Sequence, residues 1–465
     1  MLTVECCSHK GVSRTDGGKD SGRSWRYRRP RTTAGRARTT HSWGSAVGRV
    51  SRRFFGTATV GVLASVLTFS QASASGGPRG RWRERGASGA AGPGNAAGGL
   101  RGMWIATVAN IDWPARQGQP AADAQRQLTD LLDAAAELKL NTVFFQVRPT
   151  ADALWPSPHE PWSHWLTGTQ GEDPGWDPLE FAVTEAHARG LELHAWFNPY
   201  RVAMHADLTA LAGDHPARTH PEWVVTYGGR LYYNPGLPEV RAFVQDAMCH
   251  AVEHYAIDGV HWDDYFYPYP VAGETFDDAD AFAEHGGDFD DIGDWRRHNI
   301  DLLVREMRER VAELKPGVPF GVSPFGVWRN KSTDPLGSDT RGGVQTYDDL
   351  YADVRTWVKE GRLDYVLPQL YWNIGYEAAD YATLVRWWAE VAEGTGVQLY
   401  IGEALYKAGD TAQPDAWQDP AELSRHLTLC QDYPAVGGNA FYSAAHVVRD
   451  PIGAMTRVYE DHYRG

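Results

Sequence analysis

From Leu100 onward, short apolar segments of strand length alternate with amphipathic segments of helix length, and this alternation constrains the fold more than any other feature. The segments that predict strands are 101–108, 141–148, 191–198, 257–263, 318–324, 364–371, 397–403 and 436–442. Those that predict helices lie near 122–139, 178–190, 238–255, 295–314, 347–361, 381–393, 420–431 and 450–463. Asp177-Pro178 and Asp419-Pro420 each resemble a helix start, with an N-cap residue before proline. Eight strands and eight helices in alternation predict an α/β fold, a (β/α)8 TIM-type barrel formed by residues 99–465.

The loops that follow the predicted strands are long, whereas those that follow the helices are short. About 30 residues separate the second strand from its helix, and about 40 separate the third strand from its helix. Loops of this length in a compact domain are usually functional, and here they all lie on the C-terminal face of the strands. The site is therefore expected on that face. An open doubly wound sheet is the alternative, but no Gly-rich phosphate loop follows the first strand.

Charge is unevenly distributed along the chain. Residues 1–74 carry 13 Lys and Arg against three acidic residues, a net charge of +10. Because the net charge of the whole chain is −14, that of the remainder is −24. Because residues 75–465 are this acidic, the protein is a poor candidate for binding nucleic acid or an anionic membrane.

The basic N-terminal block has the features of an export signal. Ser51–Phe55 contains twin arginines, an uncharged run follows from Gly56 to Ser70, and Ala72-Ser73-Ala74 resembles a cleavage site. Residues 1–74 are thus predicted to be a leader with a twin-arginine-type signal, and 75–98 a disordered Gly/Ala-rich linker. We expect a secreted or extracytoplasmic protein. A transmembrane anchor is the weaker alternative, because the apolar run is short and rich in Ala, Gly and Thr.

No metal or cofactor site is predicted. Cys249 and Cys430 lie on distant helices, so two buried thiols are favoured over a disulfide. The acidic segment 277–294 lacks the spacing of a calcium loop and is expected to be a solvated loop that caps the helix starting at Trp295.

The most informative stretch is Ile257–Pro270, which reads IDGVHWDDYFYPYP. Side chains alternate along a strand, so His261 and Asp263 share one face while Val260 and Trp262 share the other. If Val260 and Trp262 pack outward against helices, His261 and Asp263 point into the barrel. A carboxylate at a strand tip beside aromatic rings is typical of acid/base or nucleophilic chemistry on a sugar. The alternative is an aspartate that only caps the next loop or helix.

Other predicted strands also end in polar or aromatic residues. By alternation, the inward-facing sets are Gln146 with Arg148, His194 with Trp196 and Asn198, and Gln369 with Tyr371. Buried polar groups are costly if unpaired, which favours a bound polar ligand, although an internal polar network is also possible. The candidate substrate-binding residues are Trp104, Asn110, Trp113, Gln146, Arg148, His194, Trp196, Asn198, Arg201, His261, Tyr265, Tyr267, Ser323, Trp328, Arg329, Gln369, Tyr371, Trp372, Tyr406 and Tyr442.

Six segments together resemble the glycoside hydrolase-like family 10 barrels, which bacteria export. They are LRGMWIATVANIDWP, HAWFNPYR, DGVHWDDYFYPYP, FGVSPFGVWRN, LPQLYW and LYIGEALYK, in the family's order across almost all of residues 100–446. The resemblance implies a hydrolase of cell-wall glycan, with a peptidoglycan-like β-1,4 hexosaminide as polysaccharide substrate.

A looser similarity suggests catalytic roles. The spacing of Gly259 to Asp263 is similar to the fourth strand of α-amylase-like barrels, whose terminal aspartate is the nucleophile, and it favours Asp263 as the central carboxylate. His261 stands where those barrels have arginine, and their strand-five acid has no counterpart here. Glu403, at the end of the seventh strand, is expected to face Asp263 as the second carboxyl group, and Asp264 is the alternative if the strand end bends. One carboxyl group must stay protonated while the other is ionised.

Three other functions remain open. A non-catalytic glycan-binding barrel would keep the aromatic platforms without cleaving the chain, and a hydrolase of another polysaccharide would share the chemistry. A metal-dependent deacetylase or esterase is a further alternative, whereas no Gly-x-Ser-x-Gly elbow supports a serine esterase.

Overall fold

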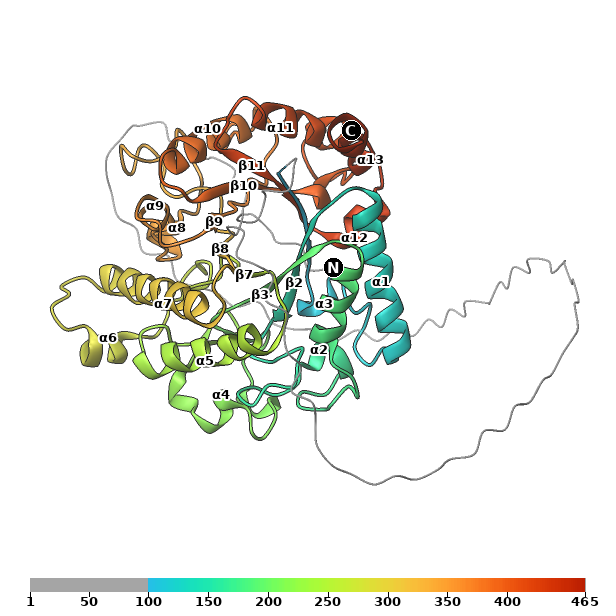
Figure 1. The fold of residues 1–465 in the computed structure, drawn as a ribbon. Helices are drawn as coiled ribbons and strands as arrows, with labels where there is room; N and C mark the ends of the chain where they lie inside the picture. Colours follow the sequence, from blue (N-terminus) through green and yellow to red (C-terminus); the bar gives the residue numbers. More distant parts are fainter. Residues whose placement is uncertain (1–98, 465) are drawn as a thin grey trace, which may run out of the picture. The chain divides into compact units, whose positions relative to one another are not determined.

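The computed structural model describes residues 99–464, which form a closed barrel of eight parallel strands surrounded by helices (Figure 1). The order around the barrel is β1-β11-β10-β9-β8-β7-β3-β2. The predicted (β/α)8 barrel and its eight strands are confirmed. The strands are β1 (Leu100–Ile105), β2 (Thr142–Arg148), β3 (Glu192–Phe197), β7 (Gly259–Trp262), β8 (Phe320–Val322), β9 (Tyr365–Val366), β10 (Gln398–Glu403) and β11 (Val436–Phe441).

Helices follow the strands and cover the outside of the barrel. The N-cap predicted at Asp177 is present, since its carboxylate accepts the N–H groups of Leu179 and Glu180, both at 3.1 Å. The principal helices are α1 (Ala121–Glu137), α3 (Pro178–Ala188), α5 (Pro238–His254), α7 (Ile292–Leu314), α9 (Val354–Lys359), α10 (Tyr381–Ala392), α11 (Glu422–Cys430), α12 (Ala444–Arg449) and α13 (Ala454–Val458).

Three predicted helices differ from those observed. Segment 347–361 is split into α8 (Thr346–Asp349) and α9, because Tyr351 between them has a left-handed φ of 52° that interrupts helical geometry. α11 begins at Glu422, and Asp419 caps only the preceding turn by accepting the N–H of Ala421 at 2.9 Å. The last predicted helix, 450–463, begins only at α13 and continues as a π-helical turn through Tyr463, because Gly453 has a φ of 74°.

The long segment between β3 and α5 contains a small antiparallel sheet that was not predicted. Its strands are β4 (Arg201–Ala203), β5 (Val224–Tyr227) and β6 (Arg230–Tyr233), in the order β4-β6-β5. Gly228 and Gly229 join β5 to β6 with φ values of 58° and 69°, the backbone of a two-residue hairpin turn. The Gly-Gly pair between two segments rich in Val, Leu and Tyr was the available sequence signal.

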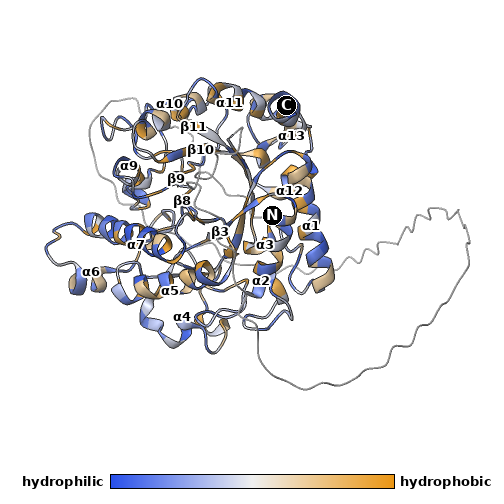
Figure 2. Ribbon diagram, in the orientation of Figure 1, coloured by the Kyte–Doolittle hydropathy of each residue, from blue (hydrophilic) through white to orange (hydrophobic). Residues whose placement is uncertain are grey.

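The barrel interior is filled by aromatic and apolar side chains. Trp104, Phe144, Trp196 and Tyr365 belong to this inner cluster. Gly321 provides space for it, since a Cβ there would lie 2.2 Å from the Tyr365 ring. The second and larger core lies between the strands and the helices. Figure 2 shows apolar stripes on largely hydrophilic helices such as α1 and α7, as expected for helices packed on a barrel.

Several further predictions concern the helical layer. Cys249 and Cys430 are free, buried thiols, as expected. The acidic segment includes a short helix, α6 (Ala279–His285), and Asp291 caps α7 by accepting the N–H of Asp294 at 2.9 Å. No helix within residues 99–464 is long and apolar enough to cross a membrane. The predicted leader and linker lie outside the described residues.

Candidate active site

Asp263 follows the last residue of β7 and points into the mouth of the barrel. Val260 and Trp262 pack outward in the larger core, whereas His261 contacts inner residues, so the alternation expected for this strand is observed. The Asp263 carboxylate accepts hydrogen bonds from Trp196 Nε1 at 3.1 Å and from Asn198 Nδ2, which lies 3.0 Å from both of its oxygens. These donors come from β3 and the residue just beyond it, so two neighbouring strand tips fix the carboxylate.

Two opposing effects act on the protonation of Asp263. Burial raises the pKa of this carboxyl group, because it removes water from the charged form. The Arg201 charge and the donors from Asn198, the Tyr265 backbone N–H and Trp196 favour the ionised form and oppose that rise. Asp263 is therefore surrounded by groups suited to a carboxylate.

Asp264 also lies at the mouth, because the chain bends at this residue. Its carboxylate accepts a hydrogen bond from the Tyr269 hydroxyl and one from the Gln369 side chain. Gln369 follows β9, and its Nε2 also donates to the Ser323 carbonyl at 2.9 Å, which connects Asp264 to the tips of β8 and β9. Burial first, and then repulsion from Asp263, raise the pKa of Asp264 to about 6. The two adjacent carboxyl groups thus have different surroundings and can hold different protonation states.

Arg201 joins the loop after β2 to the Asp263 side of the mouth. Its backbone N–H donates to Asn198 Oδ1 at 2.9 Å, and its Nε donates to the Pro149 carbonyl at 3.0 Å. The guanidinium lies 5.0 Å from the centre of the Tyr265 ring, within cation–π range. Arg201 therefore orients both Asn198 and an aromatic ring next to Asp263.

Half-buried aromatic rings follow five of the strand tips, those of β7 to β11, near the two carboxylates. Tyr371 lies 5.8 Å from Tyr406 and 6.2 Å from Tyr442 between ring centres. On the other side, Phe325 contacts both Tyr269, at 6.0 Å, and Trp372, at 5.4 Å. Flat apolar faces with polar edges suit sugar rings. Tyr269 and Phe325 were missing from the predicted set, although both stand in the aromatic runs that the sequence showed.

Three predicted substrate-binding residues lie deeper, inside the barrel. Trp104 Nε1 donates to His261 Nε2 at 3.1 Å, and the Tyr365 hydroxyl lies 3.0 Å from Nδ1 of both His261 and His194. Burial, and then the nearby His194, lower the pKa of His261 well below its usual value. These side chains form an internal polar network, the alternative that the sequence had left open.

Gln146 and Arg148 hold loops in place. Gln146 Oε1 accepts the backbone N–H groups of Thr107 and Val108 at 3.0 and 2.9 Å, which fixes the segment after β1. Arg148 is completely buried and forms a two-pronged ion pair with Glu160 while also donating to the Asn198 carbonyl. The sequence had placed both residues in contact with substrate. The protein engages the Gln146 side-chain oxygen and the Arg148 guanidinium, whereas Gln146 Nε2 is buried without a hydrogen-bond partner.

Asn110 and Trp113 serve the same loop architecture. Asn110 Nδ2 donates to the carbonyls of Pro114 and Trp165 at 3.0 and 2.9 Å. The Trp113 side chain is fully buried, and its Nε1 donates to the Ala124 carbonyl of α1 at 2.8 Å. The protein itself therefore accepts the N–H groups of both the Trp113 indole and the Asn110 amide.

Tyr267, Trp328 and Arg329 are likewise structural. The Tyr267 hydroxyl donates to Asp278 at 3.2 Å, and Trp328 Nε1 donates to Asp353 at 3.0 Å. Arg329 forms ion pairs with Asp348 of α8 at 2.7 Å and with Asp334 of its own loop at 3.0 Å. All three anchor loops of the C-terminal face.

Glu403 does not face Asp263, contrary to expectation. It lies on the outer side of β10, completely buried in the helical layer. Its carboxylate accepts from the Tyr381 hydroxyl at 2.6 Å and Asn439 Nδ2 at 2.8 Å, and it lies 2.8 Å from His426 Nδ1. Leu399 and Ile401 point outward on the same strand, and Glu403 continues their alternation.

A buried carboxylate that the prediction omitted, Asp112, orders the loops after β1 and β11. It accepts the backbone N–H of Ala106 at 2.8 Å and that of Ala445 at 2.9 Å, and the Ser443 hydroxyl at 2.6 Å. Burial raises its pKa to about 6, although these hydrogen bonds act in the opposite direction. Asp112 thereby positions the segment that carries Tyr442.

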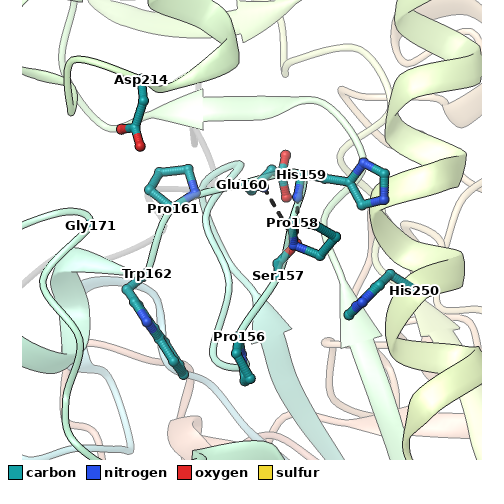
Figure 3. A pocket seen from close by; sticks show the side chains of 10 residues that line it. All are labelled: Pro156, Ser157, Pro158, His159, Glu160, Pro161, Trp162, Gly171, Asp214 and His250. Atoms are coloured by element: carbon teal, nitrogen blue, oxygen red, sulfur yellow. Dashed lines mark hydrogen bonds between the residues drawn. The ribbon is translucent and has the colours of Figure 1, made fainter.

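A separate hollow of about 520 Å³ lies between the loop after β2 and helix α5 (Figure 3). Figure 3 shows His159 of the loop and His250 of α5 on one side of it, with Trp162 across from them. None of its lining residues is among the hydrogen-bond partners of Asp263 or Asp264. Among residues 99–464, no group of three or more His, Cys, Asp and Glu side chains is arranged to hold a metal ion.

Comparison with known proteins gives concordant matches. Residues 99–419 match the family described as glycosyl hydrolase-like 10. The chain is 48% identical to the glycosyl hydrolase YngK of Bacillus subtilis over 366 residues, which cover 78% of this chain and 72% of that protein. It is 43% identical to the glycosyl hydrolase DigH of Escherichia coli K12 over 364 residues, 74% of this chain and 82% of that protein. Among solved structures, the glycoside hydrolase domain of PgaB (BpsB) from Bordetella bronchiseptica has the same fold, with a TM-score of 0.51 at 12% identity over 78% of this chain and 99% of that one.

Proposed function

The chain belongs to the glycosyl hydrolase-like 10 family, and from this premise we propose that it is an exported glycoside hydrolase of a bacterial wall glycan, a peptidoglycan-like β-1,4 hexosaminide. The observation that carries the proposal is the pair of adjacent carboxyl groups, Asp263 and Asp264, at the mouth of the barrel. Glycoside hydrolysis needs one protonated and one ionised group, and the surroundings of this pair favour such a division. Asp264 is the acid, and Asp263 is the carboxylate.

The rim of the mouth is suited to a sugar chain. Tyr371, Tyr406 and Tyr442 present half-buried rings on one side, and Phe325 and Trp372 do so on the other. Aromatic faces can stack on the apolar faces of hexose rings while the polar edges remain solvated. A glycan strand lying across the mouth would pass over the two carboxyl groups.

Export is proposed from the sequence of residues 51–74. Replacing Arg52 and Arg53 together by lysine should keep a fused reporter inside the cell, whereas the unchanged signal should deliver it outside the cytoplasm. A fully exported Lys-Lys variant would contradict the twin-arginine route.

The direct test is cleavage of purified, peptide-free wall glycan, followed by mass spectrometry of the products and measurement of new reducing ends. Asp263→Asn and Asp264→Asn should each lower the rate by roughly 10²- to 10⁴-fold, the usual contribution of such groups. Asp258→Asn is the matched control, because Asp258 lies at the opposite end of the same strand and accepts the Leu193 N–H at 2.8 Å. Circular dichroism would verify that all three variants fold.

Two outcomes would contradict the proposal. Full activity of folded Asp263→Asn would remove the assigned carboxylate. Retention of the unmodified protein on insoluble wall material without any new reducing ends would instead support a non-catalytic glycan-binding barrel.

A further inference from the structure

The two carboxylates of the mouth are consecutive in the chain and reach it from one strand tip, that of β7. In most glycosidases, two carboxyl groups flank the scissile bond from opposite faces of the sugar, one as acid and the other as nucleophile or base. Glu403, the group expected on the opposite side, is enclosed among Tyr381, His426 and Asn439 in the helical layer. Within residues 99–464, the carboxylate predicted for the opposite side is therefore not at the mouth.

The other buried carboxylates of residues 99–464 are also engaged by protein groups. Asp112 accepts three hydrogen bonds from the loops after β1 and β11, and Glu160 is paired with Arg148. Asp152 accepts from the Thr150 hydroxyl at 3.1 Å. The remaining two are Asp278, paired with Arg296, and Glu422, paired with Arg425 and near His426.

Resting on the proposed function, we propose that cleavage is assisted by the substrate: the 2-acetamido group of the sugar at the mouth is the nucleophile, Asp263 orients it, and Asp264 is the acid. In the first step, the acetamido carbonyl oxygen forms a bond to C1 while the C1–O glycosidic bond breaks. The leaving oxygen takes the Asp264 proton, and the sugar becomes a cyclic oxazolinium ion. In the second step, a water oxygen bonds to C1, the ring C1–O bond breaks, and the water proton passes to Asp264.

The surroundings of Asp263 fit this orienting task. Its oxygens are held by Trp196 and Asn198 at 3.0–3.1 Å and by the Tyr265 backbone N–H at 3.2 Å. An ionised carboxylate fixed in this way can accept the N–H of an acetamido group, which positions the amide and increases the electron density on its carbonyl oxygen. It also stabilises the positive charge of the oxazolinium ion.

The surroundings of Asp264 fit an acid that later acts as a base. Fewer groups stabilise its charge, namely the Tyr269 hydroxyl, the backbone N–H of Asp264 itself and Gln369, and it lies beside the Asp263 charge. Its negative charge is therefore less favoured than that of Asp263, so it holds a proton at the start of the cycle. The acetamido oxygen and then water each displace a group at C1 with inversion, so the product keeps the anomeric configuration of the substrate.

This mechanism restricts the substrate class to sugars that carry a 2-acetamido group on the residue whose bond is cleaved. The test uses peptide-free wall glycan that is N-deacetylated, and portions that are then re-acylated with acetyl or trifluoroacetyl groups. We expect no cleavage of deacetylated strands, full recovery after acetylation, and cleavage at least about tenfold slower after trifluoroacetylation, because fluorine withdraws electrons from the carbonyl nucleophile. NMR of the first products should show the β-anomer.

The outcomes separate the two proposals. Equal rates for acetylated and trifluoroacetylated strands, or an initial α-anomer, would overturn substrate assistance and leave the hydrolase proposal intact. If fully acetylated strands are not cleaved at all, the proposed function fails, and this inference fails with it. Azide added to Asp263→Ala gives a further readout: an α-glycosyl azide would mark Asp263 as a covalent nucleophile and overturn the proposal.

Discussion

Tyr269→Phe tests whether Asp264 is the acid. The Tyr269 hydroxyl donates to the Asp264 carboxylate and favours its ionised form. A hydrogen bond to a charged group contributes about 1.5–3 kcal/mol. Since 1.36 kcal/mol corresponds to one pKa unit, loss of the hydroxyl should raise the pKa of Asp264 by about 1–2 units.

The sign of the effect on activity follows from the role of the acid. An acid must be protonated, so kcat/KM should fall in the unmodified protein as pH rises through the Asp264 pKa of about 6. In Tyr269→Phe the alkaline limb should move upward to about pH 7–8. The assay is the initial rate of reducing-end formation on peptide-free wall glycan, measured across the pH range at low substrate concentration.

Tyr255→Phe is the matched control. The Tyr255 hydroxyl also donates to an aspartate, Asp177, at 2.6 Å, but this carboxylate caps α3 in the helical layer. This variant also removes a tyrosine hydroxyl that donates to an aspartate, but the alkaline limb of its kcat/KM profile should stay where it is in the unmodified protein. If Tyr269→Phe lowers the rate without moving the limb, the tyrosine only positions substrate, and the assignment of Asp264 as the titrating acid is refuted.

Three further variants probe the surroundings of the site. Trp196→Phe removes a 3.1 Å donor to Asp263 and should lower kcat/KM roughly 10- to 100-fold in a folded protein; an unchanged rate would mean that the indole does not orient the carboxylate. Glu403→Gln breaks a buried ion pair with His426, so the free energy of unfolding measured in urea should fall by about 3–5 kcal/mol. Glycan cleavage should persist, and its loss in a folded variant would mean that Glu403 has a catalytic role. Burial alone would lower the pKa of His426, but Glu403 raises it above the ordinary value. The charged imidazole therefore stabilises the folded state below about pH 6.5, and this stabilisation is lost as pH rises through the pKa of the folded state. His426→Gln should flatten that decline in urea unfolding, and an equally steep decline would exclude His426 as its source.

Part of the site was predictable because it depends only on local periodicity. Asp263 could be placed inside the barrel because the bulky Val260 and Trp262 alternate with it on β7. The inner position of Trp196 followed in the same way, and it proved to donate to Asp263. Asn198, expected to face inward at the tip of its strand, also donates to this carboxylate.

Other residues were misplaced because a strand of a parallel barrel is buried on both faces. β10 reads as a continuous apolar run, Leu399 to Ile401, so its sequence does not show which face Glu403 occupies. Arg148 was assigned to the mouth for a similar reason. Its actual partner, Glu160, lies in a loop whose path no local pattern predicts.

The sequence by itself determined the barrel, the face that carries the site and the inward direction of Asp263, because helix and strand periods, caps and loop lengths are local properties of the chain. Only the tertiary structure decided which second carboxyl group accompanies it. The bend at Asp264, its bonds to Tyr269 and Gln369, and the enclosure of Glu403 by α10 and α11 all depend on how segments distant in sequence pack together.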